Sequence, residues 1–442
     1  MEILLYTIVF LLLLVVSNVT NRFLPQLPLP LVQIVLGISL GFILPQEKFH
    51  LDTELFLALV IGPLLFREAE ESNITSILKH WRIVLYLIFP VIFISTVGLG
   101  YLAHLLWGAL PLAACVAVGA ALGPTDLVAF ASLSERFSFP KRVENILKGE
   151  GLLNDASGLV AFRVALLAWT TGSFSLGKAS ISLVLSIIGG FVIGMLSAGL
   201  NRWLHKLLMS AQVSDIASEL LLELSLPLVT FFLAEEIHVS GIIAVVVAGI
   251  FKASRFKRIT LLEAQVDSVT ETIWNTVNFM LNGSVFIILG MELEMIAILK
   301  SPIYDNLLLL LSIVLLTLLL FALRFVMLFT FYFIRIRRLH KNFRNYLKEM
   351  LLLTFSGVKG TVSIATILLI PSQLEQDHPL LLFLVAGVTF LSFLTGLLTL
   401  PHLSEEREEE AEHLMHIAIL NEVVGELEAS LKQAKAKVPL YA

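Results

Sequence analysis

Two carboxylates and an amide interrupt a long apolar stretch of the sequence. Glu150, Asn154 and Asp155 lie in GEGLLNDASG, inside a run that is otherwise largely apolar from about 143 to 170. On a helix Glu150 and Asn154 share a face, and Asp155 is turned from Asn154 by about 100°. If the run crosses a membrane, Asp155 lies about 18 Å from its start, near the middle of the apolar layer. A charge there costs at least about 2.5–3.5 kcal/mol, which favours an ion or proton pathway over a purely structural ion pair.

A second polar segment, GPTDLVAF at residues 123–130, interrupts another apolar run. Gly123 and Pro124 predict a break in the helix, and Thr125 and Asp126 follow directly. Freed backbone groups are tolerated in a membrane where they line a cavity or pack inside protein. Their carbonyl oxygens, together with carboxylate oxygens, could replace the water shell of a small cation. The alternative is a kinked helix with a structural role only.

A third segment, FSGVKGTVSIA at residues 355–365, has the same character. Gly357 and Gly360 interrupt an apolar run, and Lys359 lies between them at mid-depth. A buried lysine needs a negative partner. We expect Glu150 or another carboxylate to supply it, and a Glu150–Lys359 ion pair is the preferred interpretation.

Other charges in apolar surroundings are weaker signals. Arg324 is interpreted as structural, and Arg163 as a side chain that reaches outward to water. The charges of FREAEESN, at residues 66–73, are interpreted as a solvated face. No phosphate-binding GxxxxGK[ST] segment and no metal-ligand spacing of histidines occur in the sequence.

The composition is that of a polytopic membrane protein. Of 442 residues, 57% are hydrophobic and 15% are charged, and the mean hydropathy is +0.90. Soluble domains carry about 25% charged residues. The single cysteine, Cys115, excludes a disulfide within this chain. The N-terminal apolar run lacks a basic start and a cleavage site, so we interpret it as a first membrane helix.

The chain contains thirteen runs long enough to be considered as membrane spans. They lie near 3–20, 28–45, 52–67, 83–107, 109–134, 143–170, 179–207, 217–236, 238–253, 270–291, 304–335, 347–371 and 379–401. Twenty loop Lys and Arg residues then fall on one side and three on the other, which predicts an outside N-terminus and a cytoplasmic C-terminus. Residues 404–442 form a separate, amphipathic cytoplasmic tail.

The fifth and twelfth runs, which are both interrupted, are seven runs apart. Because seven is odd, the second of two matching helices would cross the membrane in the opposite direction to the first. This predicts two inverted six-helix repeats, about 1–175 and 211–403, joined by a linker helix at about 176–210 within a membrane domain of residues 1–403. Paired interrupted spans in matching positions of two halves are typical of a transporter's binding site.

These segments resemble the cation:proton antiporter superfamily, in its electroneutral NhaP/NHE-like branch. GEGLLNDASG and TDLVA are similar to two of its motifs, and HVSGIIAVVVAGI, VFIILGMEL, FSGVKGTVSIA and TFLSFLTGLLTLP follow in the family's order. The resemblance covers about residues 5–401.

The resemblance implies a homodimeric exchanger in the plasma membrane whose core domain moves by an elevator-like step. Asp155 would bind either Na⁺ (or Li⁺ or K⁺) or a proton, with Thr125 and Asp126 completing the site. Asn154 would mark one-for-one, electroneutral exchange, and Glu150 would pair with the basic residue of the twelfth helix. No catalytic residue, cofactor or nucleic-acid partner is implied. An electrogenic antiporter or a cation channel of the same fold remains the alternative; an intramembrane enzyme or a receptor is less favoured.

Three positions depart from the family's pattern. Lys359 stands where arginine is usual, Leu127 follows the aspartate of the fifth run in place of proline, and Gly151 replaces a serine. A lysine lacks the two-pronged hydrogen bonding of arginine, and the glycine removes a hydroxyl from the ligand set.

Overall fold

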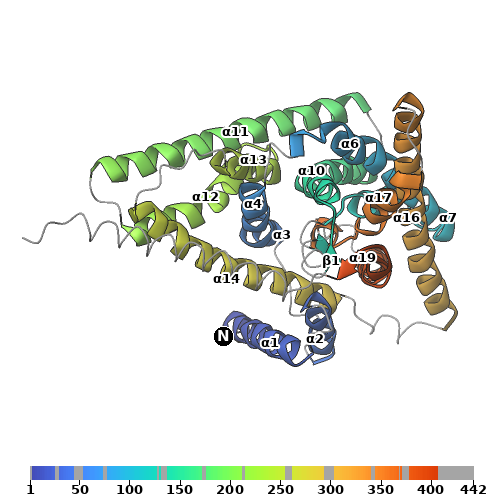
Figure 1. Ribbon diagram of the computed structural model, residues 1–442. Helices are drawn as coiled ribbons and strands as arrows, with labels where there is room; N and C mark the ends of the chain where they lie inside the picture. The colour runs from blue at the N-terminus through green and yellow to red at the C-terminus, as the bar shows by residue number, and fades with distance from the viewer. Residues whose placement is uncertain are drawn as a thin grey trace, which may run out of the picture.

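The apolar runs of the sequence form long helices that pack side by side in the computed structural model (Figure 1). The structure describes residues 2–24, 29–43, 53–72, 77–126, 129–130, 137–171, 176–211, 215–253, 261–292, 303–339, 344–367, 369–370 and 378–406. Within these ranges almost all of the secondary structure is helical, as the composition predicted.

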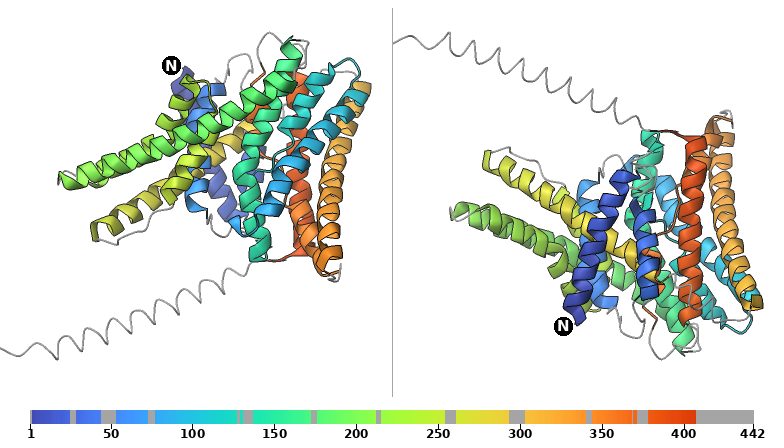
Figure 2. Two further views of the ribbon diagram at one scale, coloured as in Figure 1. Left: turned by 90° about the horizontal axis from the view of Figure 1, so that it is seen from above. Right: turned by 90° about the horizontal axis from the view of Figure 1, so that it is seen from below.

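One group of helices contains the beginning of the predicted first repeat, the predicted linker helix and the beginning of the predicted second repeat. It consists of α1 (Glu2–Phe23), α2 (Leu29–Ile43), α3 (Thr53–Phe56), η2 (Leu57–Ile61), α4 (Gly62–Glu71), α11 (Leu176–Ser210), α12 (Ile216–Glu236), α13 (Gly241–Ala253) and α14 (Leu261–Glu292). Here α13 packs on α4, α11 and α12, and α14 packs along α2. Figure 2 shows α11 and α14 extending away from the remaining helices.

The second group carries the three polar segments of the sequence. It consists of α6 (Trp81–Tyr86), η3 (Leu87–Val91), α7 (Ile92–Leu106), α8 (Leu112–Ala121), α10 (Lys141–Thr171), α16 (Ile303–Leu339), α17 (Arg344–Phe355), α18 (Thr361–Ile367) and α19 (His378–Leu403). Its centre is α8, which packs on α7, α10, α18 and α19. The residues of α8 are mostly alanine, glycine and valine, so neighbouring helices approach it closely.

Membrane spans are evident from helix length and apolar composition. In the described ranges, seven helices are long and apolar enough to cross a membrane, and four further apolar helices are shorter. Every predicted run contains helical residues, although two of the runs are broken by non-helical chain. The number of thirteen spans and the inverted repeats stay predictions.

A two-stranded ladder joins the loop before α10 to the chain after α19. Strand β1 (Phe137–Ser138) pairs antiparallel with β2 (Glu405–Glu406), so that Phe137 is opposite Glu406. The rest of the predicted amphipathic tail, from residue 407 onward, lies outside the described residues.

Candidate ion-binding site

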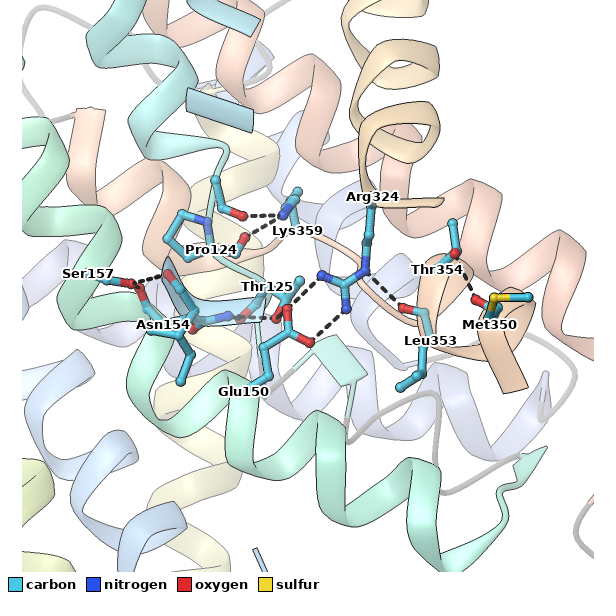
Figure 3. A network of polar contacts seen from close by, with 12 residues as sticks. Pro124, Thr125, Glu150, Asn154, Ser157, Arg324, Met350, Leu353, Thr354 and Lys359 are labelled. Carbon is cyan, nitrogen blue, oxygen red and sulfur yellow. Dashed lines mark hydrogen bonds and ion pairs between the residues drawn. The ribbon is translucent and has the colours of Figure 1, made fainter. Parts of the chain in front are cut away.

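The two predicted helix breaks meet inside the second group of helices. Helix α8 ends at Ala121 and the chain continues without helix through residue 126, while residues 356–360 separate α17 from α18. The backbone N–H of Asp126 donates to the carbonyl oxygen of Val358 at 3.0 Å. Gly123, Pro124, Gly357 and Gly360 therefore all lie in non-helical chain. Figure 3 shows Pro124 and Lys359 next to one another where the two segments cross.

Lys359 holds the crossing together. Its Nζ donates to the carbonyl oxygens of Gly123 and Pro124, each at 2.7 Å, and its backbone N–H donates to Ser392 Oγ at 3.0 Å. The residue is only 2% exposed. Because the helix has ended, those two carbonyls lack helical partners, and the ammonium group satisfies them in place of water.

The partner of Glu150 is Arg324 on α16, so the predicted Glu150–Lys359 ion pair is wrong. Arg324 Nη1 and Nη2 donate to Glu150 Oε1 and Oε2 at 2.6 and 2.7 Å, and Arg324 Nε donates to the carbonyl oxygen of Leu353 at 2.9 Å. Both side chains of the pair are buried. The flat guanidinium matches both carboxylate oxygens at once, which an ammonium group cannot do. The signal for this residue was present in the sequence, since a mid-helix arginine in an apolar run also requires a carboxylate.

Thr125 and Asn154 connect the break to α10. Asn154 Nδ2 donates to the carbonyl oxygen of Thr125 at 3.0 Å and to Thr125 Oγ1 at 2.6 Å, and Thr125 Oγ1 donates to Glu150 Oε1 at 3.0 Å. A carbonyl can only accept, so these bonds fix which way the Asn154 amide points. Its buried Oδ1 atom has no hydrogen-bond partner in the described part of the chain. This leaves one amide oxygen available to a ligand beside the break.

Asp126 lies directly against the other break. Its Oδ1 accepts from the backbone N–H of Ala129 at 2.9 Å, and the residue is 4% exposed. A Cβ atom at Gly360 would come within 2.1 Å of Asp126 Oδ2, so only glycine leaves room for the carboxylate. Gly360, one of the two glycines that predicted the second break, is thus also the residue that allows Asp126 to approach this segment closely.

Asp155 follows Asn154 on α10, and its side chain lies outside the described part of the structure. Its neighbours fix where its backbone lies. Asn154 bonds to the break, and at Gly158 a Cβ atom would meet Pro124 Cγ at 2.0 Å. The α10 backbone at Asp155 therefore runs between two residues that touch the break. Of the family departures, Gly151 lies within α10, and Leu127 lies outside the described residues.

The assembled groups are oxygen donors rather than transition-metal ligands. In the described ranges no group of three or more His, Cys, Asp or Glu side chains could hold a metal ion. Carbonyl, amide and carboxylate oxygens around a helix break suit a hard alkali cation, which they can coordinate in place of water.

Comparison with known proteins identifies the family. Residues 8–405 match the family described as "Sodium/hydrogen exchanger, transmembrane". The chain belongs to the sodium/hydrogen exchanger family. This confirms the resemblance to cation:proton antiporters that the motifs indicated.

Two bacterial members of the sodium/hydrogen exchanger family are similar over nearly all of this chain. Both are named sodium, potassium, lithium and rubidium/H⁺ antiporter. The Bacillus pumilus protein is 34% identical over 99% of this chain, and the Bacillus subtilis protein is 36% identical over 92%. The chain spans only 65% and 62% of the length of these two relatives.

A solved structure of a sodium proton antiporter has a similar fold. The sodium proton antiporter MjNhaP1 from Methanocaldococcus jannaschii at pH 8 is 18% identical, with a TM-score of 0.66 over 91% of this chain and 97% of that one. At that identity the likeness concerns the fold. It supports the exchanger architecture that the interrupted helices predicted.

Proposed function

We propose that this protein exchanges monovalent cations for protons across the plasma membrane, one for one, with Asp155 as the shared site. The observation that carries this proposal is the crossing of two helix breaks beside α10, with a buried and unpartnered oxygen of Asn154 next to it. The names of the two Bacillus relatives support monovalent cations as substrates. Na⁺ is the expected substrate, with Li⁺ and K⁺ as further candidates.

Competition at one carboxylate would couple the two fluxes. An ionised carboxylate in a membrane interior is costly, and either a proton or a cation removes that cost. If only the neutralised site crosses the membrane readily, the loaded and protonated states move and the empty charged state does not. This produces exchange instead of leak.

The surrounding charges would stay fixed during this cycle. Glu150 and Arg324 neutralise one another through two hydrogen bonds, and Lys359 is held by two carbonyl oxygens. These groups would support the site as a rigid frame. Thr125, Asp126 and Asn154 would then contribute oxygens to the cation beside Asp155.

Alternating access would require one group of helices to move against the other in an elevator-like step. The second group, which contains the crossing, would be the moving part. The first group would remain anchored in the bilayer and would make the homodimer contact. The N-terminus would face outward and residues after α19 would lie in the cytoplasm.

Purified protein in liposomes containing a pH-sensitive dye tests the exchange. Addition of Na⁺, Li⁺ or K⁺ should change the internal pH, and Asp155→Asn should abolish that change. Asp215→Asn is the matched control, because Asp215 is an aspartate at the exposed start of α12. Full activity of a folded Asp155→Asn protein would refute the assignment.

The same liposomes distinguish the alternatives. An electroneutral exchanger should transport at a rate that is independent of membrane potential. A rate that follows the potential while protons still move would favour an electrogenic antiporter. Cation current without proton movement would favour a channel.

A further inference from the structure

Helix α14 carries a line of polar side chains within a membrane-spanning stretch. Thr270, Trp274, Asn278 and Asn282 are each four residues apart, so they lie along one side of the helix. The buried oxygens Thr270 Oγ1, Asn278 Oδ1 and Asn282 Oδ1 have no hydrogen-bond partner among the described residues. An unsatisfied buried polar atom is destabilising, because it has lost its hydrogen bonds to water. Three such oxygens in one line indicate a ligand that is attracted to oxygen.

One end of this line touches a cluster of charges that is partly buried. Trp274 is fully buried and its Nε1 donates to Glu223 Oε1 at 3.0 Å. Lys252 Nζ lies 2.7 Å from the same Glu223 oxygen and 3.0 Å from Glu70 Oε1, and Arg67 Nη1 lies 2.9 Å from Glu70 Oε2. The sequence predicts a solvated face for Arg67 and Glu70, but their side chains are only 13% and 16% exposed. The predicted orientation puts this cluster at the cytoplasmic end.

The other end of the line leads to the crossing of the helix breaks. Val285 and Ile288 continue the same side of α14 and belong to one buried cluster with Val362 of α18. Helix α18 begins directly after Gly360, the glycine that contacts Asp126. Asn278 and Asn282 therefore lie between the charged cluster and the candidate site, about 6 and 12 Å along the helix from Trp274.

We propose that Asn278 and Asn282 form a second, weaker binding site for an alkali cation, which the ion occupies between the cytoplasmic cluster and Asp155. The two side-chain carbonyl oxygens would replace part of the ion's water shell. Because these ligands are neutral, the ion would be held loosely and could move on to the carboxylate. This inference rests on the proposed function, which makes Asp155 the ion's destination.

The test uses Tl⁺, an electron-dense alkali-cation substitute, in crystals of the full chain. Anomalous scattering should show Tl⁺ beside the Asn278 and Asn282 oxygens in the wild type and also in Asp155→Asn. Leucine has nearly the volume of asparagine but no oxygen, so the Asn278→Leu/Asn282→Leu protein should lose that peak. Asn275→Leu, an exposed position on the same helix, should keep it.

The outcomes separate this inference from the proposed function. A wild-type protein with no Tl⁺ at the two asparagines, or a peak that persists in the double leucine variant, overturns the second site. If Asp155→Asn abolishes the Tl⁺ peak at the asparagines as well as the peak at position 155, the second site is not independent of the carboxylate, and the proposal is overturned. A peak at the asparagines together with none at Asp155 supports the second site and contradicts the proposed function instead.

A transport measurement provides a second readout. At limiting Na⁺, the double leucine variant should exchange at least roughly fivefold more slowly than Asn275→Leu. This is the change in rate expected when the ion loses one contact as strong as a hydrogen bond. At saturating Na⁺ the two variants should converge, because the chemistry at Asp155 is untouched. Equal rates at limiting Na⁺ would overturn a role in ion entry.

Discussion

At the scale of single residues, the sequence indicates which charges need partners but not which partners they find. Glu150 and Arg324 are 174 positions apart, and they meet because α10 and α16 pack against the same neighbours, α7, η3 and α17. Depth along each helix made Lys359 an equally good candidate. Hydrogen-bond geometry decides the pairing, because two carboxylate oxygens and a guanidinium match while the ammonium group fits the two freed carbonyls.

The Glu150–Arg324 pair predicts a large loss of stability when one partner is removed. Arg324→Met should lower the free energy of unfolding by about 3–5 kcal/mol, because it leaves a buried carboxylate without its counter-charge. Arg324→Lys should recover only part of this. The double variant Glu150→Leu/Arg324→Met should be more stable than Arg324→Met alone. Thermal unfolding in detergent measures all three.

Arg163→Met is the control for that series. Arg163 Nη2 lies 3.5 Å from Glu235 Oε1, and both side chains are substantially exposed. Pairs of this kind contribute about 0–1 kcal/mol. If the Arg324→Met protein is as stable as Arg163→Met, the Glu150–Arg324 pair does not stabilise the fold as predicted.

At the scale of helices, hydropathy predicted where helical segments occur and glycine and proline predicted where two of them break. The structure has non-helical chain at both places. Further features were not predicted, among them the π-helical turn η3 around Pro90 and the tight contact of α10 with the break. The contact with the break does not follow from local sequence, because it depends on which helix packs alongside.

The contact between α10 and the break makes Gly158 a sensitive position. Gly158→Ala should destabilise the protein and reduce exchange, since its Cβ would come within 2.0 Å of Pro124 Cγ. Gly199→Ala on α11 is the control, because nothing lies within 4 Å of a Cβ there. That change should leave stability equal or raise it by about 0.5–1 kcal/mol. Thermal unfolding and liposome exchange of both variants would reveal whether the close approach matters.

The start of α12 predicts a pH-dependent helix end. The hydroxyl and the backbone N–H of Ser218 donate to Asp215 and lower the pKa of that carboxyl below its ordinary 3.8. A lowered pKa stabilises the folded state above the ordinary value, and that contribution disappears as the pH falls through the folded-state pKa. Asp215→Ala should therefore speed amide hydrogen exchange in the first turn of α12 at pH 7.

The difference between wild type and Asp215→Ala should narrow below about pH 4. Asp215→Asn caps the helix without titrating, and it should protect the first turn at either pH. A constant difference between wild type and Asp215→Ala across this range would exclude the carboxylate as the cause.

At the scale of the whole molecule, ordered motifs predicted the family, whereas the spatial arrangement of the two helix groups came only from the structure. Polar pairs between the groups are informative about motion. Arg163 of α10 and Glu235 of α12 form such a pair, and Glu235 Oε1 also accepts from the backbone N–H of Gly241. If one group moves against the other, this contact must break and form again in each cycle.

The exposed Arg163–Glu235 pair should therefore have only a modest effect on the rate of exchange. Exchange by Arg163→Glu should change by no more than roughly fivefold, the equivalent of about 1 kcal/mol, and Arg163→Glu/Glu235→Arg should return it toward wild type. Rates in liposomes over a range of Na⁺ concentrations measure this. A loss of several hundredfold, or no recovery in the double variant, would show that the pair has another role.

The β1–β2 ladder has a mechanical consequence. Glu405 and Glu406 are hydrogen-bonded to the strand just before α10, the helix that carries Asn154. A force that pulls on the chain after residue 406 therefore acts first on that ladder and, through it, on the start of α10. A molecule that binds the protein beyond this point would therefore pull on the group of helices in which the two breaks cross.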